Sequence, residues 1–338
     1  MLQVEETGPV AASRPPAGTD RTVLASVVSE DFVAGFVVME RSLRETNPGW
    51  RQPIVAIDSD ASPLSPTAKA VIREHCHNVH FARANARALA PVHAYARDVI
   101  GTPPRLWPAF AVLETTRWSA FDRVIAIDSD VIVRGALEPL LHAPGSFSAV
   151  RARRPETDEQ SGYFNTGVMV LNRPMLVGFD MHRLHEYLGR RQPAPGTGKA
   201  DQAVLNMLWH NEVMGYLPDR FNFTKRSLMF RLRAGAPQVL DDPEAIDAWL
   251  TENGIAIFHY VGEKPWNHKV RSTELAYAAM DELWHELLGR YAQRSLLRLV
   301  NEQRRAWQDR YNAIVRRAQQ KNLQGLRLER EIAREMGL

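Results

Sequence analysis

The tetrapeptide Ile-Asp-Ser-Asp occurs twice in this chain, at residues 57–60 and 127–130. The second copy has an apolar segment on each side, so we expect its two carboxylates to lie at a break between buried strands. Burial of two like charges is costly unless a cation or strong hydrogen-bond donors neutralise them. Asp128 and Asp130 therefore predict a cation-binding site.

The first copy has different surroundings. Asp58 and Asp60 follow an apolar run and precede Ala-Ser-Pro-Leu-Ser-Pro66, where a strand is expected to pass into a turn rich in proline and serine. This context favours a structural cap at the end of a strand.

His259 and Lys264 are the best partners for the second pair of aspartates. His259 ends the apolar run 255–258, and two carboxylates with one imidazole suit Mn²⁺ or Mg²⁺ better than a metal that prefers thiolates. Lys264 is one of six lysines in a chain with 36 arginines, and it stands between Gly262 and Pro265-Trp266. Its ammonium group could meet a phosphate as a point charge.

Three further segments contain residue types that often line a polar crevice. In 162–172, Asn165 and Gly167 precede a buried strand, where a small residue lets a ligand approach the backbone; a simple glycine turn is equally compatible. Asp201 begins an expected helix and could be its N-cap. The segment 221–223 places an asparagine between two phenylalanines.

These residues need a scaffold, and strands alternate with helices over the first half of the chain. Strands are expected at 22–28, 53–57, 79–81 and up to Asp128, and helices at 31–46, from about Ser65 and within 105–118. This alternation predicts an α/β fold of three layers with a mainly parallel sheet. In such sheets the ligand crevice lies at the carboxyl ends of the strands.

The second half is expected to contain strands near 148–150, 168–171 and 255–259 and a helix near Asp201. From about Val270 the sequence turns helical and charged. Two apolar helical faces are expected there, made by Leu283, Leu287 and Tyr291 and by Trp307, Tyr311, Ile314 and Val315. They predict helices that pack on the domain or on a second copy in a homodimer, or a basic helix on an anionic membrane surface.

Composition sets the wider limits. The chain has 338 residues, of which 45% are hydrophobic, so it can bury a sizeable core. Its one cysteine, Cys76, excludes an internal disulfide and favours a reducing, cytoplasmic location. Peripheral contact with the inner face of the membrane stays open. Residues 1–20 are expected to form a flexible leader, 21–269 a catalytic domain and 270–338 a helical basic extension. From Leu287 onward there are 12 Lys and Arg against 5 Asp and Glu, yet no zinc spacing or aromatic signature favours nucleic-acid binding.

Taken in order, four blocks resemble glycosyltransferase family 8, the retaining nucleotide-sugar transferases with the GT-A fold. The blocks are Phe121-Asp-Arg-Val-Ile-Ala-Ile-Asp-Ser-Asp-Val-Ile-Val133, Tyr163-Phe-Asn-Thr-Gly-Val-Met-Val-Leu-Asn172, Ala200-Asp-Gln-Ala-Val-Leu-Asn206 and His259-Tyr-Val-Gly-Glu-Lys-Pro-Trp266. The last is one residue shorter between glycine and lysine than the family pattern. The resemblance covers roughly residues 21–268.

The resemblance implies a nucleotide-sugar donor, UDP-linked above all, with Mn²⁺ or Mg²⁺ on its diphosphate. It implies metal binding by Asp128, Asp130 and His259, and catalytic roles for Asp201 and Gln202, with Gln202 beneath the anomeric carbon. Donor contacts are implied for Ser26, Ser29, Asp128, Ser129, Asn165, Thr166, Gly167, Asp201, Gln202, Gly262 and Lys264. The acceptor, whether a glycan, a lipid-linked saccharide, a protein or a small molecule, is not specified.

Two positions depart from the family pattern. Ser29-Glu-Asp-Phe32 stands where the family has an Asp-x-x-Tyr block that reads the base. The family also has a basic residue at a position near Ala111, where this chain has none, so Arg105 is the candidate substitute.

Two functions other than glycosyl transfer are also compatible with the sequence. One is a phosphohydrolase of the haloacid dehalogenase type, with Asp241-Asp242 as its later acidic motif, and the other is a non-catalytic nucleotide-sugar-binding protein. A sugar nucleotidyltransferase is less compatible, because no glycine-rich phosphate loop follows the first strand.

Overall fold

A computed structural model describes residues 21–190, 200–209, 211, 215–235, 242–267, 275–320 and 334–335. Its centre is a seven-stranded sheet in the order β3-β2-β1-β4-β7-β6-β8. The strands are β1 (Thr22–Val27), β2 (Ile54–Asp58), β3 (Val79–Arg83), β4 (Arg123–Ile127), β6 (Phe147–Arg153), β7 (Gln160–Asn172) and β8 (Gly215–Leu217). The expected leader, 1–20, lies outside the described residues.

The first four strands of the sheet are parallel. Leu24 of β1 lies beside Ile54 of β2 and Ile125 of β4, and all three side chains are buried because helices cover both faces. Strand β7 runs antiparallel to both β4 and β6, while β8 is parallel to β6. The sheet is therefore mixed with a dominant parallel half, and the prediction of a three-layer α/β fold is confirmed.

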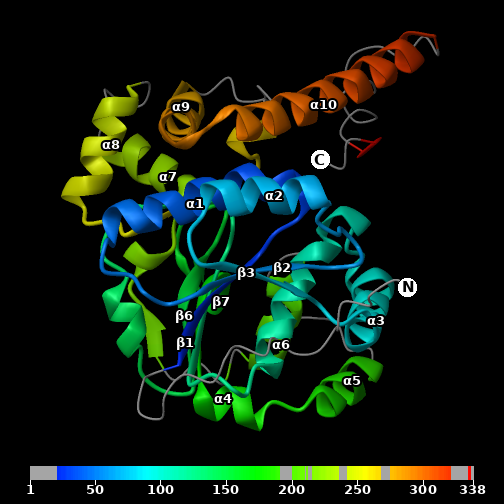
Figure 1. The fold of residues 1–338 in the computed structure, drawn as a ribbon. Coiled ribbons are helices and arrows are strands. Elements are labelled where there is room, and N and C mark those ends of the chain that lie inside the picture. The colour runs from blue at the N-terminus through cyan, green and yellow to red at the C-terminus, as the bar shows by residue number, and fades with distance from the viewer. Residues whose placement is uncertain are drawn as a thin grey trace.

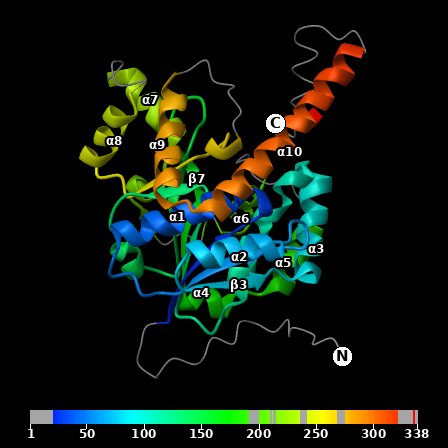
Figure 2. The same ribbon diagram turned by 45° about the horizontal axis from the view of Figure 1, so that its top comes forward.

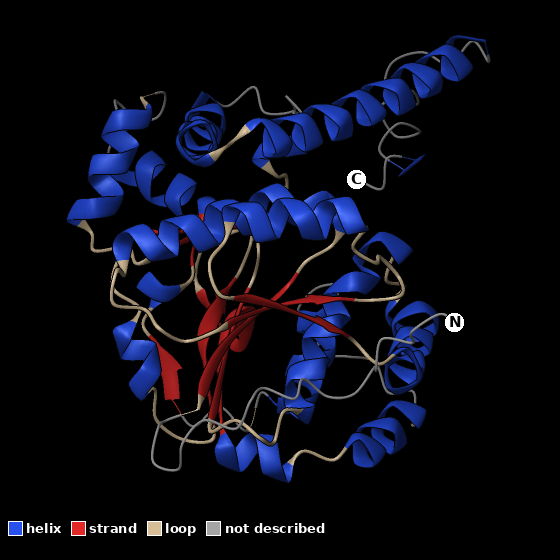
Figure 3. Cartoon of the chain, in the orientation of Figure 1, coloured by secondary structure: helices blue, strands red, loops and turns tan. Residues whose placement is uncertain are grey.

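Helices lie above and below the sheet (Figures 1 and 3). One side holds α1 (Val33–Thr46) and α2 (Pro66–His75), with α7 (Lys225–Gly235), α8 (Pro243–Glu252), α9 (Leu275–Tyr291) and α10 (Arg294–Gln320) beyond them. The other side holds α3 (Ala86–Tyr95), η2 (Ala96–Ile100), η3 (Pro104–Arg117), α4 (Arg173–Gly178), α5 (Met181–Gly189) and α6 (Asp201–Trp209). Short turns form η1 (Glu30–Phe32), η4 (Glu138–His142), η5 (Asp219–Phe221) and η7 (Pro265–Asn267).

A second, three-stranded sheet brings distant parts of the chain together. It has the order β5 (Val131–Val133), β10 (Ile257–His259), β9 (Phe223–Thr224). His259 lies opposite Val131 in the antiparallel pair, and the Tyr260 N–H donates to the Asp130 carbonyl at 2.9 Å. This small sheet therefore carries His259 to the second Ile-Asp-Ser-Asp copy.

Gly35 allows α1 to lie against the same loop. A Cβ atom at this position would be 2.5 Å from the Trp266 ring and 2.6 Å from the Ser129 carbonyl oxygen, so a larger residue requires one of them to move. Trp266 also packs edge-on against Phe32, with ring centroids 5.3 Å apart. Helix α1, the Asp128–Asp130 loop and the segment after His259 thus meet at one closely packed point.

The C-terminal helices differ in how they contact the rest of the chain. Met280, Trp284 and Leu288 of α9 are buried in the same core cluster as α1. Helix α10 begins against the body through Leu296 and Val300 and then extends away from it (Figures 1 and 2). The predicted face of Trp307, Tyr311, Ile314 and Val315 falls on α10, at side chains outside the described part of the structure. Within that part, every helix is too short or too polar to span a bilayer.

Some elements depart from the sequence prediction. The helix expected within 105–118 is a 3-10 helix with Pro108 inside it, and proline removes the N–H that an α-helical hydrogen bond requires. Strand β7 begins at Gln160, well before the expected residue 168, and is bent by register shifts opposite β6.

Asp58 of the first Ile-Asp-Ser-Asp copy lies at the end of β2, where its carboxylate has several hydrogen-bonding and charged partners. Its carboxylate accepts from the Arg83 guanidinium at 2.8 Å and from the Leu64 N–H at 3.0 Å, and the Lys69 Nζ lies 3.8 Å away. Asp60 is 58% exposed, and its one ion pair among the described residues is with Arg83, at 3.5 Å. In this copy the buried carboxylate of Asp58 forms an ion pair with the partly exposed Arg83, and this pair joins β2 to β3.

We predict that Asp58→Asn lowers the free energy of unfolding by about 2 kcal/mol, because the buried side chain at position 58 loses the charge that pairs with Arg83 and Lys69. Asp60→Asn is the matched control and should change stability by less than about 0.5 kcal/mol. Urea denaturation followed by circular dichroism measures both. Equal effects of the two substitutions would contradict the assignment.

Candidate active site

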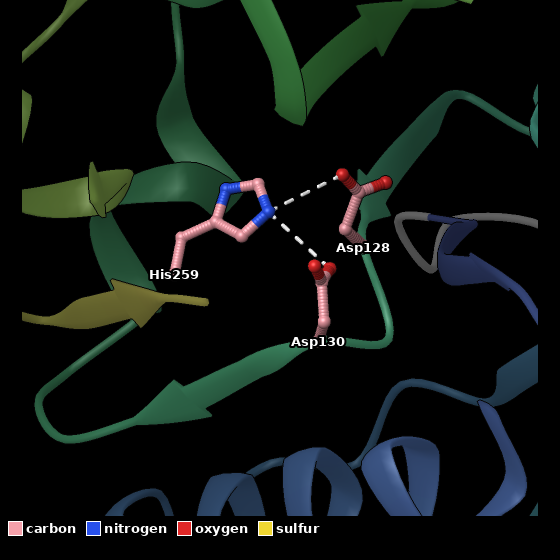
Figure 4. Close-up of side chains that lie close together, drawn as sticks. All are labelled: Asp128, Asp130 and His259. Carbon is pink, nitrogen blue, oxygen red and sulfur yellow. Dashed lines mark ion pairs between the residues drawn. The ribbon is translucent and has the colours of Figure 1, made fainter. Parts of the chain in front are cut away.

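Asp128, Asp130 and His259 converge where β4 ends and β5 begins (Figure 4). The His259 Nε2 atom lies 3.2 Å from a carboxylate oxygen of Asp130 and 3.6 Å from one of Asp128. One ligand atom from each residue lies within 4.8 Å of the other two. Two carboxylates and one imidazole at this separation fit a divalent cation that prefers oxygen, such as Mn²⁺ or Mg²⁺.

Lys264 adds a positive charge to the same cluster. Its Nζ atom contacts the second carboxylate oxygen of Asp130 and donates to the Tyr260 carbonyl at 2.8 Å. Asp130 and His259 are buried, whereas 42% of the Asp128 side chain is reached by solvent. The open side of the cluster is therefore at Asp128.

The two aspartates ionise differently. Partial burial of the carboxylate, reinforced by the negative charge of Asp130, raises the pKa of Asp128 to about 7. Burial also opposes ionisation of Asp130, but the charges of Lys264 and His259 prevail and hold its pKa below the usual range. The lysine and the imidazole thus stabilise one carboxylate of the pair as an anion.

A chain of hydrogen bonds fixes the His259 ring. The Nδ1 atom lies 2.7 Å from the Asn222 side-chain oxygen, and the Asn222 amide nitrogen donates to the Asn165 oxygen at 2.6 Å. The Gly167 N–H donates to that same oxygen at 2.8 Å. Because the Asn222 oxygen accepts from Nδ1–H, Nε2 is the ring nitrogen that faces Asp128 and Asp130.

Gly167 makes room for this ring. A Cβ atom here would lie 2.4 Å from His259 Cε1 and 2.6 Å from Nδ1. Its carbonyl also accepts from the Asp128 N–H at 2.9 Å, so one residue holds the backbone of one proposed ligand and admits the ring of another.

Asp201 and Gln202 form the first turn of α6, beside the same cluster. Burial raises the pKa of Asp201 to about 6, and the charge of Asp130 adds to the rise while a hydrogen bond from Thr166 opposes it. Asn206, one turn later, donates to the Gln202 carbonyl at 2.9 Å and bonds both backbone groups of Phe164. Helix α6 is therefore fastened to β7, which carries Asn165, Thr166 and Gly167.

The other residues expected to contact a donor have varied surroundings. The Ser129 hydroxyl donates to the Val27 carbonyl at 2.9 Å, and its side chain ties the aspartate loop to β1. The Ser26 hydroxyl is buried with no hydrogen-bond partner among the described residues, and Ser29 precedes η1. Gly262 is exposed with φ of +82°, which favours glycine, and Arg105 is exposed at the start of η3. Binding roles for these residues stay predictions.

Asn222 is the residue whose position the sequence did not predict. Its place between Phe221 and Phe223 marked it as polar among aromatic residues, but its link to His259 depends on the pairing of β9 with β10.

One residue of the acidic pair proposed for a phosphohydrolase has a structural role. Asp242 caps α8 by accepting from the Glu244 N–H at 3.0 Å, and Asp241 lies outside the described residues.

We predict that Gly167→Ala weakens Mn²⁺ binding at least about tenfold, because the new methyl group displaces the His259 ring. Gly162→Ala is the matched control on β7, since a Cβ atom there meets nothing within 4 Å. Isothermal titration calorimetry measures both affinities. An unchanged affinity in Gly167→Ala would rule out His259 as a ligand in this orientation.

The affinity for Mn²⁺ should also depend on pH. Asp128 binds a metal only as the carboxylate, and its raised pKa of about 7 means that protons compete below that pH. Affinity should rise with pH, being about tenfold weaker one unit below this pKa than on the plateau above it. Titrations at pH 6 and 8 test this. A flat profile would contradict it.

Comparisons with known proteins bear on this site. Residues 115–270 match the family model described as Glycosyl transferase family 8, and this range includes the whole cluster around Asp128 together with Asp201 and Gln202. Glycogenin of Neurospora crassa is 27% identical over 165 residues, which are 48% of this chain and 20% of that protein. The matched part thus spans about a fifth of that relative.

Solved structures share the fold. The galactosyltransferase LgtC in complex with donor and acceptor sugar analogs aligns with a TM-score of 0.58 and 22% identity, covering 80% of this chain and 96% of that one. The apo WbbM bifunctional glycosyltransferase aligns with a TM-score of 0.54 and 16% identity over 85% of this chain and 52% of that one. The GT-A fold is thereby confirmed, and residues 115–270 are similar to glycosyltransferase family 8.

Proposed function

We propose that this protein is a retaining glycosyltransferase that moves a hexose from a nucleoside diphosphate sugar to an acceptor. The observation that carries the proposal is the meeting of Asp128, Asp130 and His259 with Lys264, inside the segment that matches the family. A site with two carboxylates, an imidazole and an ammonium group suits a metal-bound diphosphate.

Asp128, Asp130 and His259 would hold the divalent cation, which we propose to be Mn²⁺. When bound, the cation neutralises charge on the departing diphosphate. Lys264 would bind the same phosphates through its ammonium group, beside the exposed backbone of Gly262. Asn165 faces the site with its side-chain oxygen already engaged, which leaves its amide group for a sugar hydroxyl.

Asp201 and Gln202 lie where the reacting sugar is expected. The Gln202 amide is a poor nucleophile, and Thr166 and the backbone hold Asp201 in hydrogen bonds. We therefore favour a displacement on the same face of the sugar, in which the departing phosphate helps to deprotonate the acceptor hydroxyl. A glycosyl ester trapped on Asp201 and found by mass spectrometry would contradict this route.

The donor is proposed to be a UDP-sugar. Ser29-Glu-Asp-Phe32 follows β1, at the carboxyl edge of the parallel strands where the base would lie.

The protein is proposed to act in the cytoplasm, which the single, buried cysteine Cys76 supports. We propose residues 21–269 as the catalytic domain and 270–338 as a helical extension that reaches a membrane surface or a second copy through α10.

The test of this function is a thermal-shift panel of UDP-, GDP- and TDP-sugars, each with and without Mn²⁺. We expect one nucleotide-sugar to raise the melting temperature only with the metal, because a ligand that binds the native state stabilises it. Asp128→Asn should remove both this shift and all metal-dependent turnover while leaving the unliganded melting temperature near that of the wild type.

Asp60→Asn is the matched control, since Asp60 belongs to the first Ile-Asp-Ser-Asp copy, at residues 57–60, which lies away from the cluster. It should keep the shift and the turnover. If no nucleotide-sugar gives a metal-dependent shift, or if Asp128→Asn retains turnover, the proposed function is wrong.

A further inference from the structure

A pocket rich in arginine lies beside the candidate active site, on the far side of Asn165 and Asn222. Its walls come from the end of β6, from β9 and from the start of α7, and the cavity between them has a volume of about 60 Å³. This is below the usual range for a site that encloses a whole small ligand, so the cavity would admit one polar group of a ligand while the rest of the ligand lies outside it. The arginines that line it are Arg151, Arg153, Arg154 and Arg226, and the acidic residues among its described lining are Asp158 and Asp219.

The carboxylates of Asp158 and Asp219 both form ion pairs with Arg153. The Arg153 guanidinium contacts Asp219 and lies 3.3 Å from Asp158, so this arginine is a structural part of the wall. Asp158 also accepts from the buried Ser227 hydroxyl at 2.6 Å. The pocket is therefore built by a fixed network that spans β6, η5 and α7.

The remaining arginines leave a positive charge facing the pocket. Arg151 stacks on the Tyr216 ring, 3.7 Å from its centroid. Arg154 and Arg226 make no side-chain hydrogen bond or ion pair with any residue that the structure describes, and Arg226 is half-buried. Guanidinium groups held without a counter-ion at the wall of a pocket favour a phosphate or a carboxylate as ligand.

This charge is separate from the group proposed to hold the donor diphosphate. Asp128, Asp130 and Lys264 do not line the pocket, whereas Asn165 and Asn222 do. Those two asparagines also hold His259, so the pocket and the metal cluster are neighbours that share one wall.

We propose that this pocket binds the acceptor, and that the acceptor is an anionic saccharide whose phosphate or carboxylate is held by Arg154 and Arg226. This rests on the proposed transferase function, which it extends by naming the chemical class of the acceptor. Transfer would join an acceptor hydroxyl oxygen to C1 of the donor hexose, release the nucleoside diphosphate, and pass the hydroxyl proton to the departing phosphate.

The test compares galactose, galactose 6-phosphate and glucuronate as probes, by ligand-observed NMR, with and without Mn²⁺ and UDP. The wild-type protein should bind at least one anionic probe about tenfold or more tightly than galactose. The double variant Arg154→Ala/Arg226→Ala should lose that preference. Arg87→Ala, which removes an exposed arginine on α3, is the matched control and should keep it.

Each result is decisive. Equal binding of all three probes by the wild-type protein would overturn the proposal, as would an unchanged preference in the double variant. Weaker UDP binding in the double variant would assign these arginines to the donor diphosphate and also overturn it. If UDP fails to bind but the anionic preference persists and depends on Arg154 and Arg226, the donor assignment fails while the anion site stands.

Discussion

Two carboxylates one residue apart, at a break between buried strands, require positive charge around them. Asp130 satisfies this requirement through Lys264 and His259, and Asp128 meets it only in part, which is why burial keeps its pKa near neutrality. The short sheet of β5, β9 and β10 exists beside this break and delivers the imidazole to it. Much of the surrounding architecture can be understood as the means of holding three charged groups within reach of one another.

Close packing gives the site its rigidity. Gly167 and Gly35 let the His259 ring, the Ser129 backbone and Trp266 approach at distances that a methyl group would not allow. The hydrogen bonds from Gly167 through Asn165 and Asn222 to His259 then leave the ring little freedom to rotate. A site arranged in this way is formed before a ligand arrives, so little binding energy is lost in ordering it.

The sequence predicted the residues of the cluster better than their supports. Asp128, Asp130, His259 and Lys264 stand in short local patterns whose order resembles glycosyltransferase family 8, and that resemblance implied that they meet at one site. The bond between Asn222 and His259 was out of reach because it depends on which strands pair across distant parts of the chain. Asp58 was recognised as structural, yet its partner Arg83 became evident only when β2 and β3 were seen side by side.

The antiparallel pairing of β10 with β5 also ties completion of the cation site to completion of the core. The aspartates and the parallel strands that position them leave the ribosome more than a hundred residues before His259. A domain generally folds as a unit, and the core cluster that contains Leu24 and Ile125 also contains Phe258 and Trp284. The nascent chain therefore lacks both a complete core and the third ligand residue of the site until its C-terminal half has emerged.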